Sequence, residues 1–295
     1  MQYFLPNPTS EDTSIVSDLS KPLLLFVGTH DYRGNVPPRM LHSHANMTEM
    51  VFFADGGGTC TVDGKTYETQ TGDLMIYNAD VLHLDDCGYL LICGAANISL
   101  PELPPNHLIP AGASPLFHLG DKADTFRNIL LSMIDVAASN TPNAAETCQY
   151  LFLAYLNQVL SLLKENQTLE ENPQVSKESI KNRGKDIQTY VDQHISERLT
   201  LTEIAEHFDL SPFYVSRVFK LATGHNLNSY QTQRRIGRAQ TLLLTTKMSM
   251  SEIAETIGYA SQGYFSKQFQ EIIGISPMQY RKQFGGRRIG QEKER

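Results

Sequence analysis

The chain has 295 residues and a net charge of −7, with 41% hydrophobic and 19% charged residues. This composition is ordinary for a globular protein and excludes a fibrous repeat or a disordered chain, while the length suggests two domains. The sequence contains no run of 18 apolar residues, no secretory signal and no CxxC pair among its four cysteines. We therefore expect a cytoplasmic protein without a membrane span, a zinc ribbon or a disulfide framework.

The charge is divided unequally along the chain. Residues 1–180 carry 8 Lys or Arg against 21 Asp or Glu, a net of −13, whereas residues 181–295 carry 17 against 11, a net of +6. A basic half behind an acidic half predicts that only the C-terminal half binds a polyanion, either nucleic acid or an anionic membrane surface.

Residues 20–120 contain short runs of strand-forming residues separated by turn residues. The dipeptide Asp63-Gly64 stands between two such runs and is typical of a tight hairpin turn. Many short strands at regular spacing predict an antiparallel β-barrel or jelly roll over about residues 20–120.

Three histidines and a glutamate stand out within this region: His42, His44, Glu49 and His83. Residues two apart on a strand point to the same face, so His42 and His44 should project together. The spacing from His42 through Glu49 to Gly56 resembles the first motif of the cupin family, and the spacing from Gly72 to His83 resembles the second. The second motif departs from the family pattern at Asn78, Asp80 and Cys87. The resemblance implies a cupin-like barrel.

Residues 122–165 predict two helices, because apolar residues recur at helical spacing on both sides of Asn140–Asn143. Part of this apolar surface should pack on the barrel. Its width also favours a paired-helix interface with a second subunit, so a homodimer through residues 122–165 is expected. Residues 166–178 are polar and predict a linker, and a helix from Ile180 to Ile195 should follow.

The basic half contains an internal repeat. Residues 201–208 match residues 250–257 at an offset of 49, and after one inserted residue the match continues at an offset of 50. Two copies so close together identify a duplicated structural unit.

Each copy of the repeat predicts a helix-turn-helix, over about residues 199–224 and 248–274. Thr202 and Ser251 are candidate N-caps for the first helices. Ser211 followed by proline is a typical start for the second helix of the first unit, and Gly224 and Gly274 should end the two second helices.

The residues facing away from the apolar stripes of the second helices indicate what the units bind. Arg and Lys pair with guanine and Gln pairs with adenine, while an aromatic ring contacts the thymine methyl group. Such residues lie near the helix N-termini, where a recognition helix makes its base contacts. The outward residues are Phe213, Ser216, Arg217 and Lys220 in the first unit and Gln262, Gly263, Ser266, Lys267 and Gln270 in the second. The alternative is a solvated helix face without a ligand.

The segment from Leu227 to Thr245 predicts a helix that separates the two units. About 17 helical residues span roughly 26 Å. That length is compatible with recognition helices set roughly 34 Å apart on one duplex. Phosphate contacts are predicted for Lys220, Arg234, Arg235 and Arg238, and surface ion pairs of the arginines with Glu203 or Glu206 are the alternative.

Residues 186–284 resemble the tandem helix-turn-helix domain of the AraC/XylS family of transcription regulators. The resemblance is carried by stretches such as Leu201–Ala205, Ser216–Lys220, Gly258-Tyr259 and Gly274–Tyr280. By position it implies base contacts from Phe213, Ser216, Arg217, Gln262, Gly263, Ser266 and Lys267. Gly263 has no side chain, so readout at that position should be narrower. The resemblance also implies a cytoplasmic dimer, often an activator, with promoter DNA and RNA polymerase as partners.

The predicted fold class is therefore α+β with two domains. Residues 1–165 should form an antiparallel barrel with a helical dimerisation pair, 166–178 a linker, 179–285 an all-α double helix-turn-helix domain, and 286–295 a basic tail. The barrel should bind a small-molecule effector, with a sugar as one candidate, in a pocket comprising His42, His44, Glu49, His83, Arg39 and Tyr77.

Three imidazoles and a carboxylate would also suit zinc, iron, manganese or nickel. The family resemblance favours an organic effector instead, so no metal, no cofactor and no enzymatic activity are expected. The alternative left open is a metal-dependent cupin enzyme, of dioxygenase or isomerase type, fused to a DNA-binding module.

Overall fold

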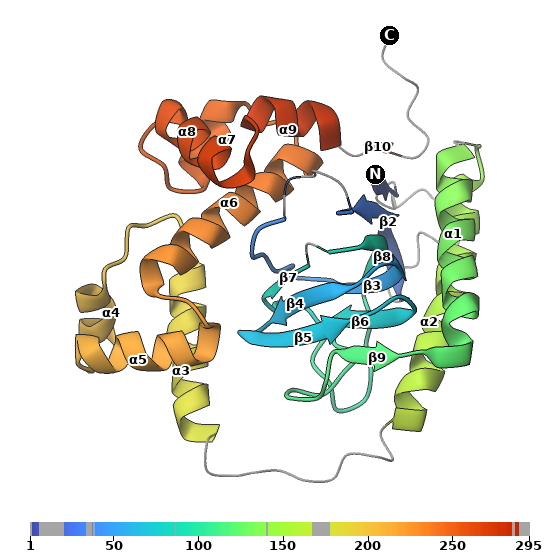
Figure 1. Ribbon diagram of the computed structural model, residues 1–295, viewed down its shortest axis with the longest axis horizontal. Coiled ribbons are helices and arrows are strands. Elements are labelled where there is room, and N and C mark those ends of the chain that lie inside the picture. Colours follow the sequence, from blue (N-terminus) through green and yellow to red (C-terminus); the bar gives the residue numbers. More distant parts are fainter. Residues whose placement is uncertain are drawn as a thin grey trace.

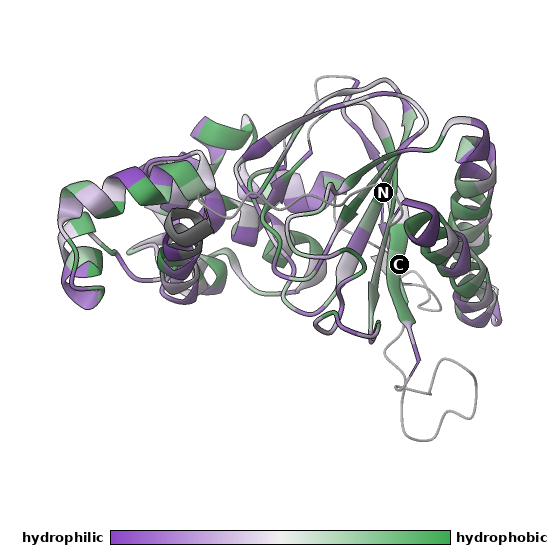
Figure 2. Cartoon of the chain, turned by 90° about the horizontal axis from the view of Figure 1, so that it is seen from below, coloured by the Kyte–Doolittle hydropathy of each residue, from purple (hydrophilic) through white to green (hydrophobic). Residues whose placement is uncertain are grey.

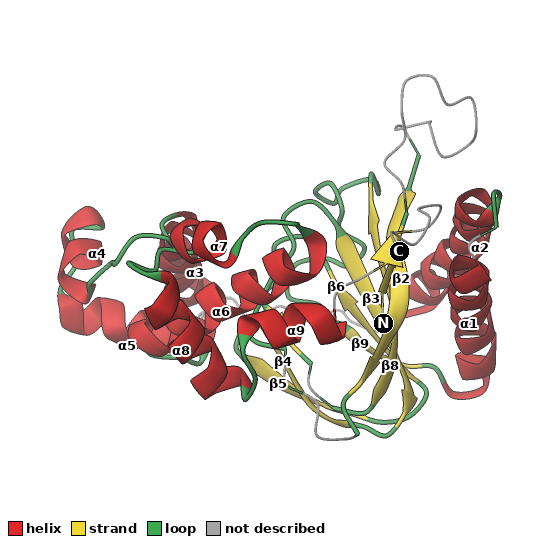
Figure 3. Cartoon of the chain, turned by 90° about the horizontal axis from the view of Figure 1, so that it is seen from above, coloured by secondary structure: helices red, strands yellow, loops and turns green. Residues whose placement is uncertain are grey.

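The computed structural model describes residues 2–5, 21–33, 37, 39–85, 87–139, 141–166, 178–284 and 287–288. Residues 167–177 of the expected linker lie outside the described residues, as does the expected basic tail apart from Arg287 and Arg288. Strands gather in the N-terminal part and helices in the C-terminal part, with two further helices on the opposite side of the strands (Figures 1 and 3). The expected two-domain α+β organisation is thus present.

The strands of the described residues form two sheets. The larger, seven-stranded sheet has the order β10-β1-β2-β8-β3-β6-β9, and the smaller, three-stranded sheet has the order β5-β4-β7. All pairs are antiparallel except β1 with β10. The strands are β1 Gln2–Phe4, β2 Leu23–Asp31, β3 Thr48–Asp55, β4 Gly58–Val62, β5 Lys65–Thr69, β6 Asp73–Tyr77, β7 His83–Leu84, β8 Tyr89–Ala96, β9 Leu116–His118 and β10 Arg287–Arg288.

An antiparallel barrel or jelly roll was expected, and a barrel is not closed here, because no ladder of the described strands joins the two sheets. A barrel closes only when the edge strands of a sheet pair with each other. Here β7 is two residues long and pairs only with β4, apart from an isolated bridge between His42 and His83. The sheets instead face each other, and Cys60 and Val62 of the smaller sheet pack with residues such as Val51 of the larger.

The Asp63-Gly64 turn joins β4 to β5, as the sequence predicts. Asp63 has φ of 47° and Gly64 has φ of 73°. Positive φ at both central residues is the requirement of the tight hairpin turn that matches strand twist.

Two helices cover the outer face of the larger sheet, at the positions the sequence predicts. These are α1 Ala123–Ser139 and α2 Ala144–Asn166, which follow a short 3-10 turn, Gly120–Lys122. Phe126 and Leu130 of α1 and Phe152 of α2 are fully buried in one core with strand residues such as Leu91. Figure 2 shows apolar residues along these strands and on the helix faces turned toward them.

Seven helices follow in the described C-terminal part, and they contain the two predicted helix-turn-helix units. The helices are α3 Glu178–Gln193, α4 Leu201–His207, α5 Pro212–Thr223, α6 Leu227–Thr245, α7 Met250–Thr256, α8 Gln262–Ile273 and α9 Pro277–Phe284. The units are α4–α5 and α7–α8, and α6 runs between them (Figure 1). None of the described helices combines the length and the apolar character that crossing a membrane requires.

The helix ends of the two units repeat the same chemistry. The first helices begin two residues earlier than expected, with Thr200 and Ser249 as N-caps, each in a reciprocal capping box with the glutamate three residues on. Thr202 and Ser251 were therefore wrong N-cap assignments, because the box needs its glutamate at the third helical position. Gly224 and Gly274 end α5 and α8 in the left-handed conformation, as predicted.

Each unit has its own hydrophobic core. Ile204, Val218 and Phe219 belong to the first core, and Ile253, Phe265 and Phe269 belong to the second. The core face of each recognition helix is thereby fixed, and the opposite face is left outward.

Candidate functional site

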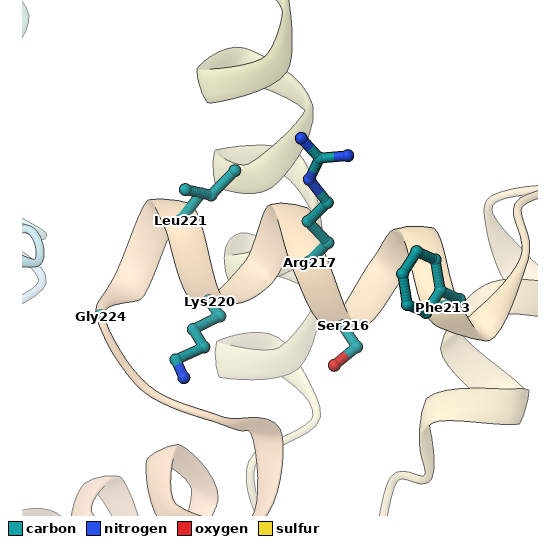
Figure 4. Close-up of a pocket in the computed structure, with 6 residues that line it drawn as sticks. All are labelled: Phe213, Ser216, Arg217, Lys220, Leu221 and Gly224. Carbon is teal, nitrogen blue, oxygen red and sulfur yellow. The ribbon is translucent and has the colours of Figure 1, made fainter.

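The outward face of α5 carries the side chains that the sequence singled out. Phe213 is 80% exposed, and Ser216, Arg217 and Lys220 are exposed as well. Arg217 projects from one side of the helix together with Leu221, whereas Ser216 and Lys220 project from the other side (Figure 4). These side chains line one shallow open pocket that ends at Gly224.

Leu221 is 68% exposed and was missed by the sequence interpretation. Its position four residues after Arg217 placed it on the outward face, so helical spacing alone held the signal. An exposed leucine beside cationic groups is suited to contact with a thymine methyl group or a sugar.

The outward face of α8 is arranged similarly. Gln262, Gly263 and Lys267 are exposed and Ser266 is half-buried. The space around Gly263 is open, since a Cβ added there would meet nothing within 4 Å. Lys267 Nζ lies 3.9 Å from Glu271 of the same helix, a pairing that is weak because both side chains are exposed.

One groove connects the two units. It is lined by Ser216 of α5, by Tyr264 and Gln268 of α8, and by residues of α6 such as Thr232. Tyr264 is 56% exposed and was also missed by the sequence interpretation. The shared groove places both recognition helices on one side of the domain, which is the arrangement that binding to one duplex requires.

The predicted phosphate-contacting arginines differ in the structure. Arg238 is exposed. Arg234 donates to Asp192 Oδ1 at 2.8 Å and to Ser43 Oγ at 3.0 Å, and its side chain is only 15% exposed. Arg235 donates to the carbonyl oxygens of Ile195 and Glu197.

The phosphate role predicted for Arg234 and Arg235 is therefore not supported by this arrangement, because their donors are used inside the protein. The glutamate partners considered from sequence are not the observed ones either. Helical spacing identified a basic face on α6 but not the neighbouring helix that covers part of it.

Four of the six residues of the expected effector pocket come together. Ligand atoms of His42, His44, Glu49 and His83 all lie within 4.8 Å of one another, and we call these four residues the polar cluster. Glu49 Oε2 lies 3.2 Å from His44 Nε2 and 3.0 Å from His83 Nε2. Glu49 and His83 are almost fully buried.

The backbone fixes the orientation of two of these imidazoles. His42 Nδ1 is 2.9 Å from the carbonyl oxygen of Met40, and His83 Nδ1 is 3.0 Å from that of Val81. A carbonyl oxygen only accepts, so each Nδ1 carries the hydrogen and each Nε2 is left to face the cluster. Hydrogen bonds from the other ring nitrogen to a carbonyl oxygen orient metal-binding histidines in this way.

Burial and neighbouring charges shift the pKa values of two members of the cluster. Burial and the nearby Arg39 guanidinium hold the pKa of His42 well below its usual range. Burial by itself raises the pKa of Glu49, but its interactions with His44 and His83 outweigh that effect and hold the pKa well below its usual range. The Glu49 carboxylate thus faces the Nε2 of His83 at 3.0 Å, and a second proton or a cation between them would satisfy both.

Unsatisfied polar atoms surround the cluster. Arg39 Nε, Tyr77 Oη and Asp85 Oδ1 are buried and make no hydrogen bond of normal geometry, although Tyr77 and Asp85 interact with each other. The Tyr77 ring stacks on His83 with centroids 3.8 Å apart. Burial raises the pKa of Asp85 to about 6. Buried polar groups are normally hydrogen-bonded, so three orphans together favour a polar ligand.

Arg39 and Tyr77 were predicted members of this pocket, whereas Asp85 was missed. Its place two residues after His83 on an extended segment was the available signal.

Comparisons with known proteins agree with the helical part of this picture. The family described as a helix-turn-helix domain matches residues 204–283. An uncharacterized HTH-type transcriptional regulator, YdiP of Escherichia coli K12, is 24% identical over 249 residues, covering 82% of this chain and 81% of that protein. The arabinose operon regulatory protein of the same organism is 31% identical over 101 residues, covering 34% and 35%.

A solved structure, the C-terminal domain of AraT, a response regulator from Geobacillus stearothermophilus, is 34% identical. It covers 38% of this chain and 89% of that chain, with a TM-score of 0.34. The match to the helix-turn-helix family falls on the residues that build the two capped units and their exposed recognition faces. The chain is a DNA-binding transcription regulator of the AraC family.

Proposed function

We propose that this regulator reads a promoter duplex through α5 and α8 and that a ligand bound at the polar cluster changes its affinity for that duplex. The groove shared by the two recognition helices is the observation that carries the DNA part of the proposal. Residues 179–285 form the DNA-binding domain and residues 1–165 form the sensing domain in this proposal.

The assigned base contacts come from the outward faces of the two recognition helices. They are Phe213, Ser216 and Arg217 of α5 and Gln262, Gly263, Ser266 and Lys267 of α8. Lys220 and Arg238 replace the larger predicted set of phosphate contacts, since both are exposed. Homodimerisation through α1 and α2 and a contact with RNA polymerase complete the proposal.

Selection of duplexes from a random pool by the full-length chain, followed by footprinting, tests the DNA part. The expected footprint has two protected segments about 10 base pairs apart, one for each recognition helix. Lys267→Ala should weaken protection of one segment only. A pool from which the chain selects nothing would refute the assignment.

The effector part is supported by the three orphaned polar atoms beside the cluster. Hydroxyl groups both donate and accept, so a polyhydroxylated small molecule could satisfy Arg39, Tyr77 and Asp85 together. A panel of neutral monosaccharides, measured by their effect on the affinity for the selected duplex, provides the test. The effect of an active sugar should be lost in His42→Ala and kept in His118→Ala, because His118 lies outside the cluster. Equal loss in both variants would refute this location.

A metal ion is the second candidate occupant, and it would fit the alternative of a metal-dependent enzyme joined to a DNA-binding module. The favouring observation is the donor set itself, in which two imidazoles are oriented by backbone carbonyls toward a carboxylate. His42, His44, Glu49 and His83 would hold the ion, which would supply Lewis-acid chemistry.

Elemental analysis after dialysis against zinc or manganese chloride distinguishes the two candidates. If the metal candidate is right, stoichiometric metal is retained by the native chain and by the control His107→Ala/His118→Ala. It should be lost from His42→Ala/His44→Ala. A native chain that retains no metal would end the second candidate.

A further inference from the structure

Two short segments join the polar cluster to the DNA-binding helices. We call residues 39–44 the strap and residues 81–84 the β7 segment. They run antiparallel and are bonded to each other at one place, where His42 N donates to the His83 carbonyl oxygen at 3.1 Å and His83 N donates back at 2.9 Å. Each segment thus contributes one histidine to the polar cluster at the point where the two pair.

The residues just before these histidines face the other way. Leu41 and Leu82 are each 1% exposed, and both belong to the hydrophobic core of the first helix-turn-helix unit, with Ile187, Val218 and Tyr230. Successive residues of extended backbone point to opposite faces. The paired segments therefore have the cluster on one face and the first DNA-binding core on the other.

The strap also reaches the second unit. Met40 packs against the core of that unit, and its backbone N–H donates to Gln240 Oε1 of α6 at 2.8 Å. Ser43 Oγ accepts from Arg234 of the same helix at 3.0 Å. Gly237 of α6 is pressed against the strap, since a Cβ added there would lie 2.5 Å from the Leu41 carbonyl oxygen.

The β4–β5 turn adds a contact beside the β7 segment. Asp63 N donates to the Leu82 carbonyl oxygen at 2.8 Å, and its carboxylate lies 3.5 Å from Lys185 Nζ of α3. A Cβ on Gly64 would come within 2.8 Å of the Ala222 carbonyl oxygen, so this turn sits against the C-terminal end of α5. Both units are thus held by segments that carry cluster histidines or adjoin them.

We propose that the strap and the β7 segment form a two-sided relay through which occupancy of the polar cluster sets the placement of the two DNA-binding units. This inference rests on the proposed function, since it assumes a ligand at the cluster. A ligand that binds to His42 or His83 and shifts its side chain also moves the backbone that carries Leu41 or Leu82. Interiors are close-packed, so a shift of that backbone must be taken up in the core that those leucines fill.

The coupling is a difference in free energy between sites, and it is measurable without the natural ligand. A change on the cluster side should alter DNA affinity only while the leucine side is intact. The experiment is a double-mutant cycle in the full-length chain, with His42→Ala as the cluster change and Leu41→Ala as the relay change. The matched background is Leu74→Ala, an equally buried leucine in the core between the larger sheet and α1–α2. The probe is a duplex selected from a random pool by the native chain.

The expected result is that His42→Ala changes the Kd for this duplex about fivefold or more in the native chain and in Leu74→Ala, a typical size for coupling between sites. In Leu41→Ala the same change should fall below about twofold. Equal changes in the Leu41→Ala and Leu74→Ala backgrounds, or no change in the native chain, would overturn the relay while leaving DNA binding intact. Failure of the native chain to select any duplex would overturn the proposed function instead.

A second pair of variants decides the matter if Leu41→Ala does not fold. Gln240→Leu removes the bond to the strap. Gln231→Leu removes another buried glutamine of α6, whose bond to the Leu199 carbonyl oxygen lies within the DNA-binding domain. The relay requires the His42→Ala effect to shrink in Gln240→Leu and to persist in Gln231→Leu. The opposite ranking, or equal effects, would overturn it.

Discussion

Replacement of Arg217 by alanine separates base recognition from phosphate attraction. Among the described residues no hydrogen bond or ion pair holds Arg217, and its side chain is exposed on α5 (Figure 4). Its removal should therefore leave the free protein as stable as before. The substitution should instead lower the free energy of DNA binding, because one bidentate contact between arginine and guanine contributes roughly 1–3 kcal/mol. That range corresponds to about a 5- to 150-fold weaker Kd.

The contrast is with Arg238→Ala, which removes an exposed cation from α6. A phosphate contact carries no sequence information, so all duplexes should weaken alike. The slope of log K against log salt should also become shallower by about 0.9. Arg217→Ala should relax the preference at one base-pair position.

Fluorescence anisotropy supplies both measurements, with the selected duplex and its single-base variants titrated at several salt concentrations. Arg217→Ala could instead weaken the affinity for all base variants equally and change the salt slope as much as Arg238→Ala does. That result would show that α5 does not read bases. The assignment of the recognition helix would then be wrong.

Three further predictions concern stability. Arg234→Ala should lower the free energy of unfolding by about 1–2 kcal/mol in urea titration, because it leaves Asp192 with one partner fewer; an unchanged midpoint would contradict this. The pKa of Asp85 is raised by burial from 3.8 to about 6, so its carboxyl favours the folded state below about pH 4 and this stability is lost as pH rises through 6. In Asp85→Asn this pH-dependent loss of stability should be absent. Profiles of unfolding free energy against pH that run parallel in the native chain and in Asp85→Asn would refute the raised pKa. Thr200→Ala and Ser249→Ala should each cost about 1 kcal/mol in thermal or urea unfolding, since each removes one capping box; a loss in only one unit would break the equivalence.

Local chemistry made much of the DNA-binding part predictable. The Ser211-Pro212 start of α5 and the glycines that end α5 and α8 depend on residues close together in the chain, so the sequence alone predicted them. The internal repeat was visible directly in the sequence. The N-caps Thr200 and Ser249 were missed by two residues because a second polar residue competed in each case. The exposed face of α5 followed directly from the spacing of Val215, Val218 and Phe219.

The sensing part was less predictable because its decisive contacts join distant segments. Short runs of strand-forming residues indicated the strands, and the Asp63-Gly64 dipeptide indicated the turn between two of them. Which strand edges pair depends on the whole chain, and the strands form two facing sheets rather than a closed barrel. Motif spacing foresaw that His42, His44, Glu49 and His83 would meet. It did not foresee Asp85 as an orphan beside them.

The sequence by itself determined the two helix-turn-helix units, their outward residues and the four residues of the polar cluster, because helical and strand periodicities and cap chemistry are local. Only the tertiary structure decided that Arg234 would bond to Asp192 and Ser43, and that Leu41 and Leu82 would fill the core of the first unit. These contacts bury groups that lie between 42 and 191 residues apart in the chain, and no local pattern encodes such distant contacts.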